Sequence, residues 1–359
     1  MILGIDGRVL EDIPISGVGE YTENFLKAFK KKYPEIECRV FFRPKWIPSK
    51  VINSLFRLKI LSLETFFGHV DHILLPNHNF TSLKKNSSYS VVVHDLSFFL
   101  FPEYFSCKGR IWHTMIHPFQ LYRGASSIIA VSESTKRDLL SFTSLPPEKI
   151  TVIYPGISEK FFNFVSDEAE KQKYIMKYNL PKHYVLFLST LEYRKNVLGV
   201  LRAFEKLKKF QEWKDIFLVI SGKKGYGFDE IEKTWNKSPV KNWIRFLGYV
   251  DSQAKPYLYS GAKMFLYPSF YEGFGFPPLE AMALGVPVVV SSVSSLPEIT
   301  RGAAITVNPF DPYILAHAMQ TLLRDQELVD ILKRNGREVA RQYSWDITAT
   351  KIFNLIEGL

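Results

Sequence analysis

Short apolar runs alternate with longer helical stretches along almost the whole chain. This alternation is typical of parallel sheets that are covered by helices. In the first half it predicts strands at 2–6, 37–42, 72–75, 90–94, 127–131 and 150–153. In the second half it predicts strands at 184–189, 216–221, 243–247, 264–267, 286–290 and 304–307, with helices at about 195–209, 228–237, 251–261, 276–284 and 311–325.

A polar stretch at 158–179 interrupts this rhythm, because it is rich in charge and has no strand pattern. At 359 residues the chain also exceeds what one hydrophobic core usually supports. We therefore predict an α/β protein with two doubly wound, parallel-sheet domains that face each other across a cleft. The domains are residues 1–165 and 166–342, and residues 343–359 form a separate amphipathic helix after a turn.

Composition narrows the class of protein. The hydrophobic fraction of 46% is that of a soluble globular protein, and no run approaches the length of apolar sequence that spans a bilayer. The first residues, 1–6, read as a strand rather than as a signal peptide, so we expect a cytoplasmic protein. Cys38 and Cys107 lack metal-type spacing and fit free thiols. Since His and Cys are scattered and no Asp-x-Asp occurs, we expect no metal site and no cofactor.

The net charge of +10 is concentrated in one early segment. Residues 27–59 hold ten Lys and Arg against Glu35 and Glu37. Apolar residues interleave with these cations, a pattern typical of surfaces that contact anionic lipid headgroups. We predict peripheral contact with the inner face of a membrane through 27–61, with a plain solvated face as the alternative; nucleic acid is the weaker reading of the same patch. The apolar residues are Trp46, Ile47, Val51, Ile52, Leu55, Phe56, Leu58 and Leu61.

The segment from Glu272 to Glu280 is the strongest candidate for chemistry. It follows an apolar run and precedes a helix, so it reads as strand, glycine loop and helix start. Gly273 and Gly275 let the backbone approach a ligand and direct N–H groups at it, and the helix adds its positive end. We expect an anion or a sugar there, with Glu280 on the first helical turn accepting bonds from a vicinal diol. The alternative is a strand-to-helix turn that needs glycine only for its geometry.

Two further strand ends in the first half carry candidate residues. The first strand is followed by a loop and by Gly17 and Gly19 at a helix start, which resembles a dinucleotide fingerprint with a long loop. We expect a phosphate or sugar near these two amides, with a tight turn as the alternative. His94 and Asp95 end a very apolar strand, which places both side chains at the carboxyl edge of the sheet. We favour a functional His94 over a core histidine.

Adjacent cations follow the strand near 188. Arg194 and Lys195 come just before a helix, where they could neutralise a diphosphate through charge-assisted bonds without a divalent ion. An ordinary exposed loop is the alternative. We expect Lys195→Ala to lower turnover strongly with little loss of fold. The chain has no Gly-x-Ser-x-Gly elbow and no phosphate loop of the Gly-Lys-Ser type.

Together these motifs resemble retaining glycosyltransferase family 4, whose members have the two-domain GT-B fold. The resemblance runs across nearly the whole chain and is most specific from Glu272 into Glu280-Ala281-Met282-Ala283-Leu284-Gly285-Val286-Pro287. It implies a nucleotide-sugar donor held mainly by the second domain, a glycan or glycolipid acceptor held by the first, and a last helix that returns to the first domain. The other matching motifs are the glycine loop at 17–19, His94-Asp95, Val131–Ser134, Tyr154-Pro155-Gly156, Arg194-Lys195-Asn196 and Phe246–Val250.

The resemblance also implies residue roles. Glu272 would contact the donor sugar and His94 would lie near its reacting carbon, while Glu280 would bind the ribose. The donor diphosphate would be held by Arg194 and Lys195, and the base would be bordered by Tyr249 and Val250. Sugar hydroxyls and phosphate would meet the segment that contains Gly273, Phe274, Gly275, Phe276 and Leu279. One departure is that Ser189-Thr190 stands where many members have an Arg after the strand.

The expected activity is that of a retaining, metal-independent hexosyltransferase, with GDP-mannose as donor and a lipid-linked or surface-polysaccharide glycan as acceptor. The resemblance is closest to bacterial mannosyltransferases of surface polysaccharide assembly. A UDP-sugar donor carrying glucose or GlcNAc is one alternative, and a non-catalytic carbohydrate- or membrane-binding protein of the same fold is another. We favour front-face substitution over a covalent Glu272 intermediate, because retaining glycosidases need two carboxylates flanking the scissile bond.

Overall fold

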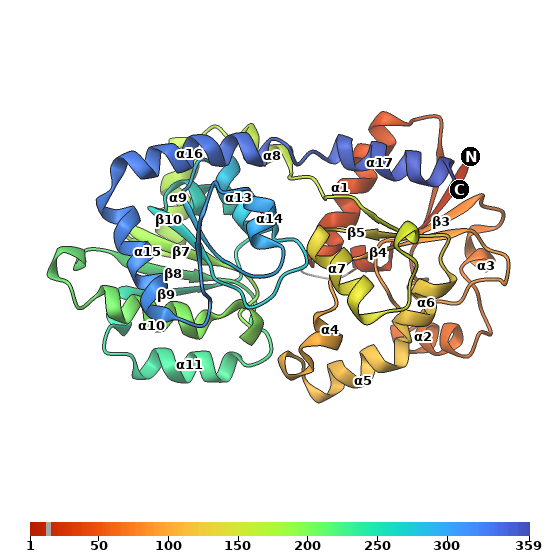
Figure 1. Cartoon of the computed structure of the whole chain (residues 1–359), viewed down its shortest axis with the longest axis horizontal. Coiled ribbons are helices and arrows are strands. Elements are labelled where there is room, and N and C mark those ends of the chain that lie inside the picture. The colour runs from red at the N-terminus through yellow and green to blue at the C-terminus, as the bar shows by residue number, and fades with distance from the viewer. Residues whose placement is uncertain (12–15) are drawn as a thin grey trace. The chain divides into compact units, whose positions relative to one another are not determined.

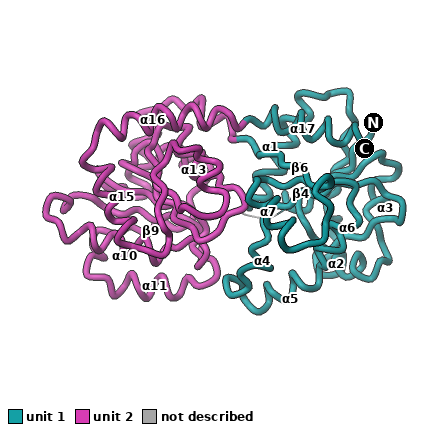
Figure 2. The backbone as a smooth tube through the Cα atoms, viewed as in Figure 1, with its two compact units in different colours: residues 1–156, 344–359 teal, residues 157–343 magenta. Residues whose placement is uncertain are grey.

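The computed structural model describes residues 1–11 and 16–359. The chain divides into two compact units, shown in teal and magenta in Figure 2. Unit 1 is Met1–Gly156 together with Ser344–Leu359, and unit 2 is Ile157–Tyr343. Each unit contains one six-stranded sheet in which all pairings are parallel. The predicted fold class, two doubly wound parallel-sheet domains, is therefore confirmed.

The sheet of unit 1 has the strand order β2-β1-β3-β4-β5-β6. Its central strand β4 is buried along its whole length, since both faces of the sheet are covered by helices. The strands are β1 (Ile2–Asp6), β2 (Glu37–Phe41), β3 (His72–Leu75), β4 (Tyr89–Val93), β5 (Ser127–Ala130) and β6 (Ile150–Val152). The helices are α1 (Gly17–Lys32), α2 (Ser49–Arg57), α3 (Glu64–Phe67), α4 (Ser97–Leu100), α5 (Cys107–Ile116), α6 (Pro118–Gly124), α7 (Glu133–Phe142) and α17 (Trp345–Glu357).

The last helix, α17, completes unit 1 by packing on α1 (Figure 1). The rings of Tyr33 and Phe353 stack at 4.2 Å between centroids. Thr348 Oγ1 donates a hydrogen bond of 2.7 Å to the carbonyl of Tyr154. Gly156 lets the chain pass close to the start of α17, since a Cβ there would lie 2.1 Å from the amide nitrogen of Trp345. The C-terminal helix thus belongs to the core of the first unit.

The sheet of unit 2 has the order β12-β11-β10-β7-β8-β9. Since the chain leaves β7 to build one side through β8 and later returns through β10 on the other side, the order reverses between β7 and β10. The strands are β7 (Tyr184–Leu188), β8 (Phe217–Ser221), β9 (Ile244–Gly248), β10 (Met264–Tyr267), β11 (Val288–Ser291) and β12 (Ile305–Val307). The helices are α8 (Glu159–Phe162), α9 (Glu168–Tyr178), α10 (Val197–Leu207), α11 (Phe228–Lys237), α12 (Lys255–Ser260), α13 (Phe276–Ala283), α14 (Leu296–Thr300), α15 (Pro312–Arg324) and α16 (Gln326–Ala340).

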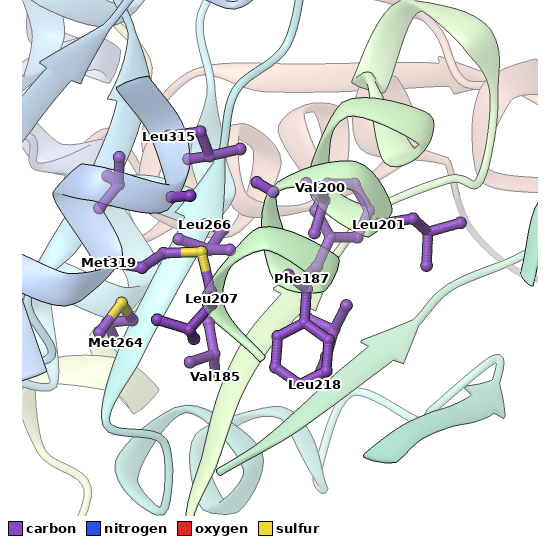
Figure 3. Close-up of a cluster of buried hydrophobic side chains, with 14 of the residues drawn as sticks. Val185, Phe187, Val200, Leu201, Leu207, Leu218, Met264, Leu266, Leu315 and Met319 are labelled. Carbon is purple, nitrogen blue, oxygen red and sulfur yellow. The ribbon is translucent and has the colours of Figure 1, made fainter. Parts of the chain in front are cut away.

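The core of unit 2 fixes the strands that carry the candidate site. Figure 3 shows part of it, a buried cluster that includes Val185 and Phe187 of β7, Leu201 of α10 and Met319 of α15. These four side chains have no solvent-exposed surface. Burial of apolar surface contributes about 25 cal/mol per Å², so this packing holds β7 and its neighbours rigidly. The loops at the carboxyl ends of these strands therefore leave from fixed points.

All twelve predicted strands are present, with ends that differ by at most two residues. The stretch 158–179, where the interdomain connection was predicted, contains α8 and α9 and lies within unit 2, which begins at Ile157. Helix α9 buries only Tyr174, so it has too weak an apolar face to show in the pattern. The predicted boundary at residue 165 also falls inside unit 2, because Phe161 is buried and packs its ring against Tyr259.

Candidate functional site

The candidate site lies at the carboxyl edge of the unit 2 sheet. Segments 189–196 after β7 and 268–275 after β10 leave the sheet there as neighbours, because β7 pairs with β10. This is the point where the strand order reverses, and such points bind ligands in doubly wound folds. The sequence placed Arg194, Lys195 and Glu272 at separate strand ends, and the structure brings all three side chains into contact.

Glu272 is the centre of this cluster and is 5% exposed. Lys195 Nζ donates to Glu272 Oε1 at 2.6 Å, and Arg194 Nη1 donates to Oε2 at 3.2 Å. Lys195, itself buried, also donates to Tyr267 Oη at 3.0 Å. Arg194 bonds the carboxylate of Glu192 and the carbonyl of Tyr271 as well. Both oxygens of Glu272 are therefore held by cations, which fixes the orientation of the carboxylate.

The charges in this cluster compensate one another. Burial alone would raise the pKa of Glu272, but the neighbouring charges of Lys195 and Arg194 hold that pKa below its usual value. Burial and the charge of Arg194 would lower the pKa of Lys195, yet Glu272 and Tyr267 raise it overall. Glu272 is thus a carboxylate and Lys195 an ammonium at neutral pH. A buried pair of this kind is costly to break from one side, because the remaining charge lacks its partner.

Asn196 joins three loops beneath the cluster. Its backbone has φ 58°, in the left-handed region that Asn tolerates better than most residues. The side-chain amide donates to the carbonyls of Pro268 and Pro309, at 3.1 and 2.7 Å. The side-chain oxygen accepts from the amide of Gly199 and caps α10. Sequence reasoning quoted Asn196 but gave it no role; an Asn just before a helix after a strand end is the signal for it.

Two serines after β11 hold the glycine loop and were missed from the sequence. The Glu272 amide donates to Ser294 Oγ at 3.0 Å. Ser295 Oγ bonds the carbonyls of Glu272 and Phe274, at 3.0 and 2.7 Å. Ser295 has no solvent-exposed surface, so this hydroxyl works as an internal brace. The signal available was their position at the carboxyl edge, directly after the strand next to β10.

Gly275 allows the loop to enter α13. Its φ is 112°, and a Cβ there would lie 2.7 Å from a methyl carbon of Leu296. Glycine is therefore required for both backbone conformation and space. The next helix positions, Pro277 and Pro278, have no N–H. The amide donors at this helix start are consequently confined to residues 273–276, the segment predicted to bind sugar hydroxyls and phosphate.

Glu280 lies in the second turn of α13, because the helix begins at Phe276. The prediction that it sits on the first turn is wrong. Its side chain is buried, with Tyr259 Oη donating to Oε2 at 2.9 Å and Lys255 Nζ lying 3.9 Å from Oε1. The carboxylate is thus held by two residues of the preceding helix α12, Lys255 at its start and Tyr259 near its end.

Several predicted donor contacts are buried in this structure. Leu279 has no solvent-exposed surface, and Val250 and Phe274 are buried as well. Phe274 packs its ring against that of Tyr343. These apolar side chains pack in the interior of unit 2; the predicted contact at Phe274 concerns its backbone amide, and the predicted donor contacts stay predictions. Tyr249 is different, because it is 55% exposed after the edge strand β9.

The glycines predicted to bind phosphate in unit 1 are placed differently from each other. Ser16 is the N-cap of α1 and its Oγ accepts the Gly19 amide at 3.2 Å. The Gly19 amide thus donates to the Ser16 cap in this structure, and its role as a ligand donor stays a prediction. Gly17 is exposed in the first helical turn, with open space where a side chain would stand. Part of the loop before it, residues 12–15, lies outside the described residues.

His94 leaves the carboxyl end of β4, as expected. Its Nε2 lies 2.8 Å from the carbonyl oxygen of Pro76, and its ring meets the ring of Tyr21 edge-on at 5.0 Å. Since a carbonyl only accepts, Nε2 carries the proton and Nδ1 is the acceptor. Burial lowers the pKa of His94, so the imidazole is neutral at pH 7. The neighbouring Asp95 Oδ1 accepts bonds from the amide and hydroxyl of Ser97.

The segment 27–61 is less uniformly exposed than its sequence pattern predicts. Ile52 and Phe56 are buried in the unit 1 core, because they lie on the inner face of α2. The large apolar side chains that reach solvent here are Phe42, Trp46, Val51, Leu58 and Ile60, with Trp46 82% exposed. Within residues 1–11 and 16–359, no helix has both the length and the apolar character needed to cross a bilayer.

The described part of the chain contains no cluster of three or more His, Cys, Asp or Glu side chains arranged for a metal ion. Cys38 and Cys107 are free thiols.

Comparison with known proteins identifies the family. Residues 168–339 match the profile of the glycosyl transferases group 1, and residues 15–161 match that of glycosyltransferase family 4. The chain is 30% identical to the O-antigen chain mannosyltransferase B of Escherichia coli, with 95% of this chain and 96% of the relative covered. The chain belongs to glycosyltransferase family 4. This glycosyltransferase is also 27% identical to the O-antigen chain mannosyltransferase RfbU of Salmonella typhimurium, over 78% of this chain and 71% of the relative.

A solved structure agrees on the fold. The Anabaena protein HepE, in complex with UDP and glucose, superposes with a TM-score of 0.75 at 18% identity. The match covers 100% of this glycosyltransferase and 99% of HepE. At this level of identity the likeness concerns the fold alone, and it agrees with the GT-B architecture expected from the sequence.

Proposed function

We propose that this glycosyltransferase transfers mannose from GDP-mannose to a lipid-linked or surface-polysaccharide glycan, with retention of anomeric configuration and without a metal ion or cofactor. The observation that carries the proposal is the 30% identity to an O-antigen mannosyltransferase across 95% of the chain. The buried cluster of Glu272, Lys195 and Arg194, at the ligand edge of the unit 2 sheet, supports a donor site there.

Residues at the ends of successive strands would bind the donor. The diphosphate would accept hydrogen bonds from the amides of residues 273–276 and from Lys195. The Lys195 ammonium has three N–H donors and uses two of them on Tyr267 and Glu272. Glu280, held by Tyr259, would accept the ribose hydroxyls. Tyr249 would border the base from the exposed end of β9. Arg194 would orient Glu272, because it bonds that carboxylate, the carboxylate of Glu192 and the carbonyl of Tyr271.

The state of Glu272 favours a binding role over a nucleophilic one. Each of its oxygens accepts a charge-assisted bond, and its pKa is lowered, which makes it a weaker nucleophile. In the proposed step the bond from the sugar C1 to the diphosphate oxygen breaks while the acceptor oxygen bonds C1 on the same face. The acceptor proton goes to the departing phosphate. Glu272 would hold a donor-sugar hydroxyl.

We also propose peripheral membrane contact through the exposed surface formed by residues 45–60. Four cations, Lys45, Lys50, Arg57 and Lys59, are exposed there beside the apolar side chains of Trp46, Val51, Leu58 and Ile60, and no acidic residue occurs between Glu37 and Glu64. Each Lys or Arg near an anionic surface adds about 1 kcal/mol.

Vesicle flotation tests the membrane proposal. Trp46→Ser with Lys50→Gln should reduce binding to phosphatidylglycerol vesicles at least fivefold. The matched control, Met176→Ser with Lys177→Gln, changes an exposed methionine and lysine of unit 2 and should leave binding unchanged. Equal loss in both variants, or none in the first, would remove the assignment of residues 45–60.

Donor hydrolysis tests the central proposal. Purified protein is incubated with GDP-mannose, GDP-glucose, UDP-glucose and UDP-GlcNAc in chelator, and released nucleoside diphosphate is measured. Release from GDP-mannose alone supports the proposal, whereas release from a UDP-sugar alone would identify that UDP-sugar as the donor instead. Glu272→Gln should slow release at least 100-fold, and Glu232→Gln, the same change in an exposed ion pair of unit 2, should not. No release and no nucleotide binding would favour a non-catalytic protein.

A further inference from the structure

A cavity of about 470 Å³ opens in unit 1, on structure that the donor chemistry does not use. It lies among α4, α5 and the start of α6. His117 makes the sharp turn between α5 and α6, with φ 52°. The volume is within the usual range for small-molecule sites, roughly 300 to 1,000 Å³. Its lining residues are Phe98, Phe99, Pro102, Arg110, His113, Thr114, His117, Pro118, Phe119 and Gln120.

Aromatic contacts build the walls of this cavity. The ring of His113 stacks on Phe98 at 4.6 Å, with an angle of 9° between planes. Phe119 meets Phe99 edge-on at 5.2 Å. Burial lowers the pKa of His113, so its ring is neutral at pH 7, and its Nδ1 is buried without a hydrogen-bond partner. The walls therefore present apolar ring surface rather than charge.

Arg110 is the one charged side chain among the ten lining residues, and it is exposed. The acids nearest to the lining are Glu103, which follows Pro102, and Asp95, whose charge acts to raise the pKa of His113. Ile111, next to Arg110 on α5, is 55% exposed, and Phe99 is 46% exposed. A ligand that matches this surface has an apolar chain and an anionic head.

We infer that this cavity binds the hydrocarbon chain of a lipid phosphate, with Arg110 contacting the phosphate. In this role the lipid phosphate is the carrier of the glycan acceptor, and that assignment rests on the proposed function. A free glycan is the rival occupant. It fits less well, because the lining has no carboxylate and only one side-chain amide, Gln120, whereas sugar hydroxyls need several such partners.

Farnesyl phosphate is a short probe of this chemistry, used below its critical micelle concentration. Its binding is measured by isothermal titration calorimetry, in parallel with farnesol, inorganic phosphate and methyl α-mannoside. Thr114→Trp fills the cavity from an exposed lining position. Thr321→Trp is the matched control, since both threonines bond the carbonyl four residues earlier in a helix. Arg110→Gln removes the guanidinium that would contact the phosphate.

The inference requires that farnesyl phosphate binds and that Thr114→Trp weakens it at least tenfold, with no change in Thr321→Trp. Arg110→Gln should weaken farnesyl phosphate at least threefold and leave farnesol unchanged. Binding of methyl α-mannoside that Thr114→Trp abolishes would overturn the inference, as would equal affinity for farnesyl phosphate in all variants. These results do not depend on a donor. Binding without any donor hydrolysis would therefore leave the cavity assigned and refute the proposed function alone.

Discussion

Replacing Lys195 by Met removes an ammonium group and keeps most of the side-chain volume. The lost contacts are those with Glu272 Oε1 at 2.6 Å and Tyr267 Oη at 3.0 Å. Lys195 and Glu272 are 7% and 5% exposed, so water cannot readily replace the lost partner. The sequence suggested little loss of fold from Lys195→Ala. The burial of this pair changes that expectation for any substitution that removes the charge.

The variant loses folding stability because the buried charge of Glu272 is left with one fewer cationic partner. Breaking a buried ion pair from one side costs about 3 to 5 kcal/mol. Arg194 still contacts Glu272 at 3.2 Å, so we expect the lower end, about 3 kcal/mol at pH 7. For a unit of the size of unit 2, roughly 2 to 4 °C per kcal/mol gives a melting temperature lowered by about 6 to 12 °C.

The pH dependence of this loss has a definite sign. In the wild-type protein the pKa of folded Glu272 is lowered, so its stabilising contribution is present above the unfolded pKa of about 4.3 and is lost as pH falls through the folded value. Without Lys195 we expect burial to dominate and to raise the folded pKa above the unfolded one. The variant then gains stability relative to wild type as the pH is lowered from 7 towards 4.5.

Differential scanning calorimetry at pH 7 and pH 5 measures both effects. We expect the gap in melting temperature between wild type and Lys195→Met to be smaller at pH 5. Adding Glu272→Gln to Lys195→Met should restore most of the lost stability, because the unpaired charge is gone. A loss below 2 °C at pH 7, or no rescue by the second substitution, would refute the reasoning.

Three other predictions concern the same edge of the sheet. Gly275→Ala should lower the free energy of unfolding by about 1 to 3 kcal/mol, since φ 112° is strained for alanine and its Cβ would crowd Leu296. Thermal melting checks this, and an unchanged melting temperature would contradict it. Asn196→Ala removes a helix cap and two bonds to neighbouring loops, so we expect a loss of about 2 to 3 kcal/mol together with slower donor hydrolysis. Removing divalent metal with chelator should leave donor hydrolysis within twofold of its original rate, whereas recovery only on adding Mg²⁺ or Mn²⁺ would contradict the metal-free proposal.

Much of the architecture could be predicted because buried parallel strands leave a strong local pattern. Runs such as Val91-Val92-Val93 or Met264–Tyr267 are apolar along their length and stand out from the helices around them. Since the carboxyl ends of parallel strands share one edge, Arg194, Lys195 and Glu272 could be assigned to that edge before their contacts were known. Helix α9 escaped prediction because it buries only Tyr174.

What escaped prediction depends on contacts between distant segments. The sequence does not reveal that Ser295 bonds two carbonyls of the glycine loop, or that Lys195 meets Glu272 in the interior. Burial of Leu279 likewise follows from the packing of α13 and not from its local sequence. Composition and spacing identify candidate groups, and the fold decides which of them face a ligand.

The central claim is that the Lys195 and Glu272 cluster binds the nucleotide-sugar donor, and the affinity for GDP-mannose tests it most directly. Isothermal titration calorimetry compares wild type with the charge-neutral double variant Lys195→Met/Glu272→Gln, whose retained fold is checked by its melting temperature. We predict that wild type binds GDP-mannose and that the folded double variant binds at least 100-fold more weakly. Equal affinity in the two proteins would contradict the claim.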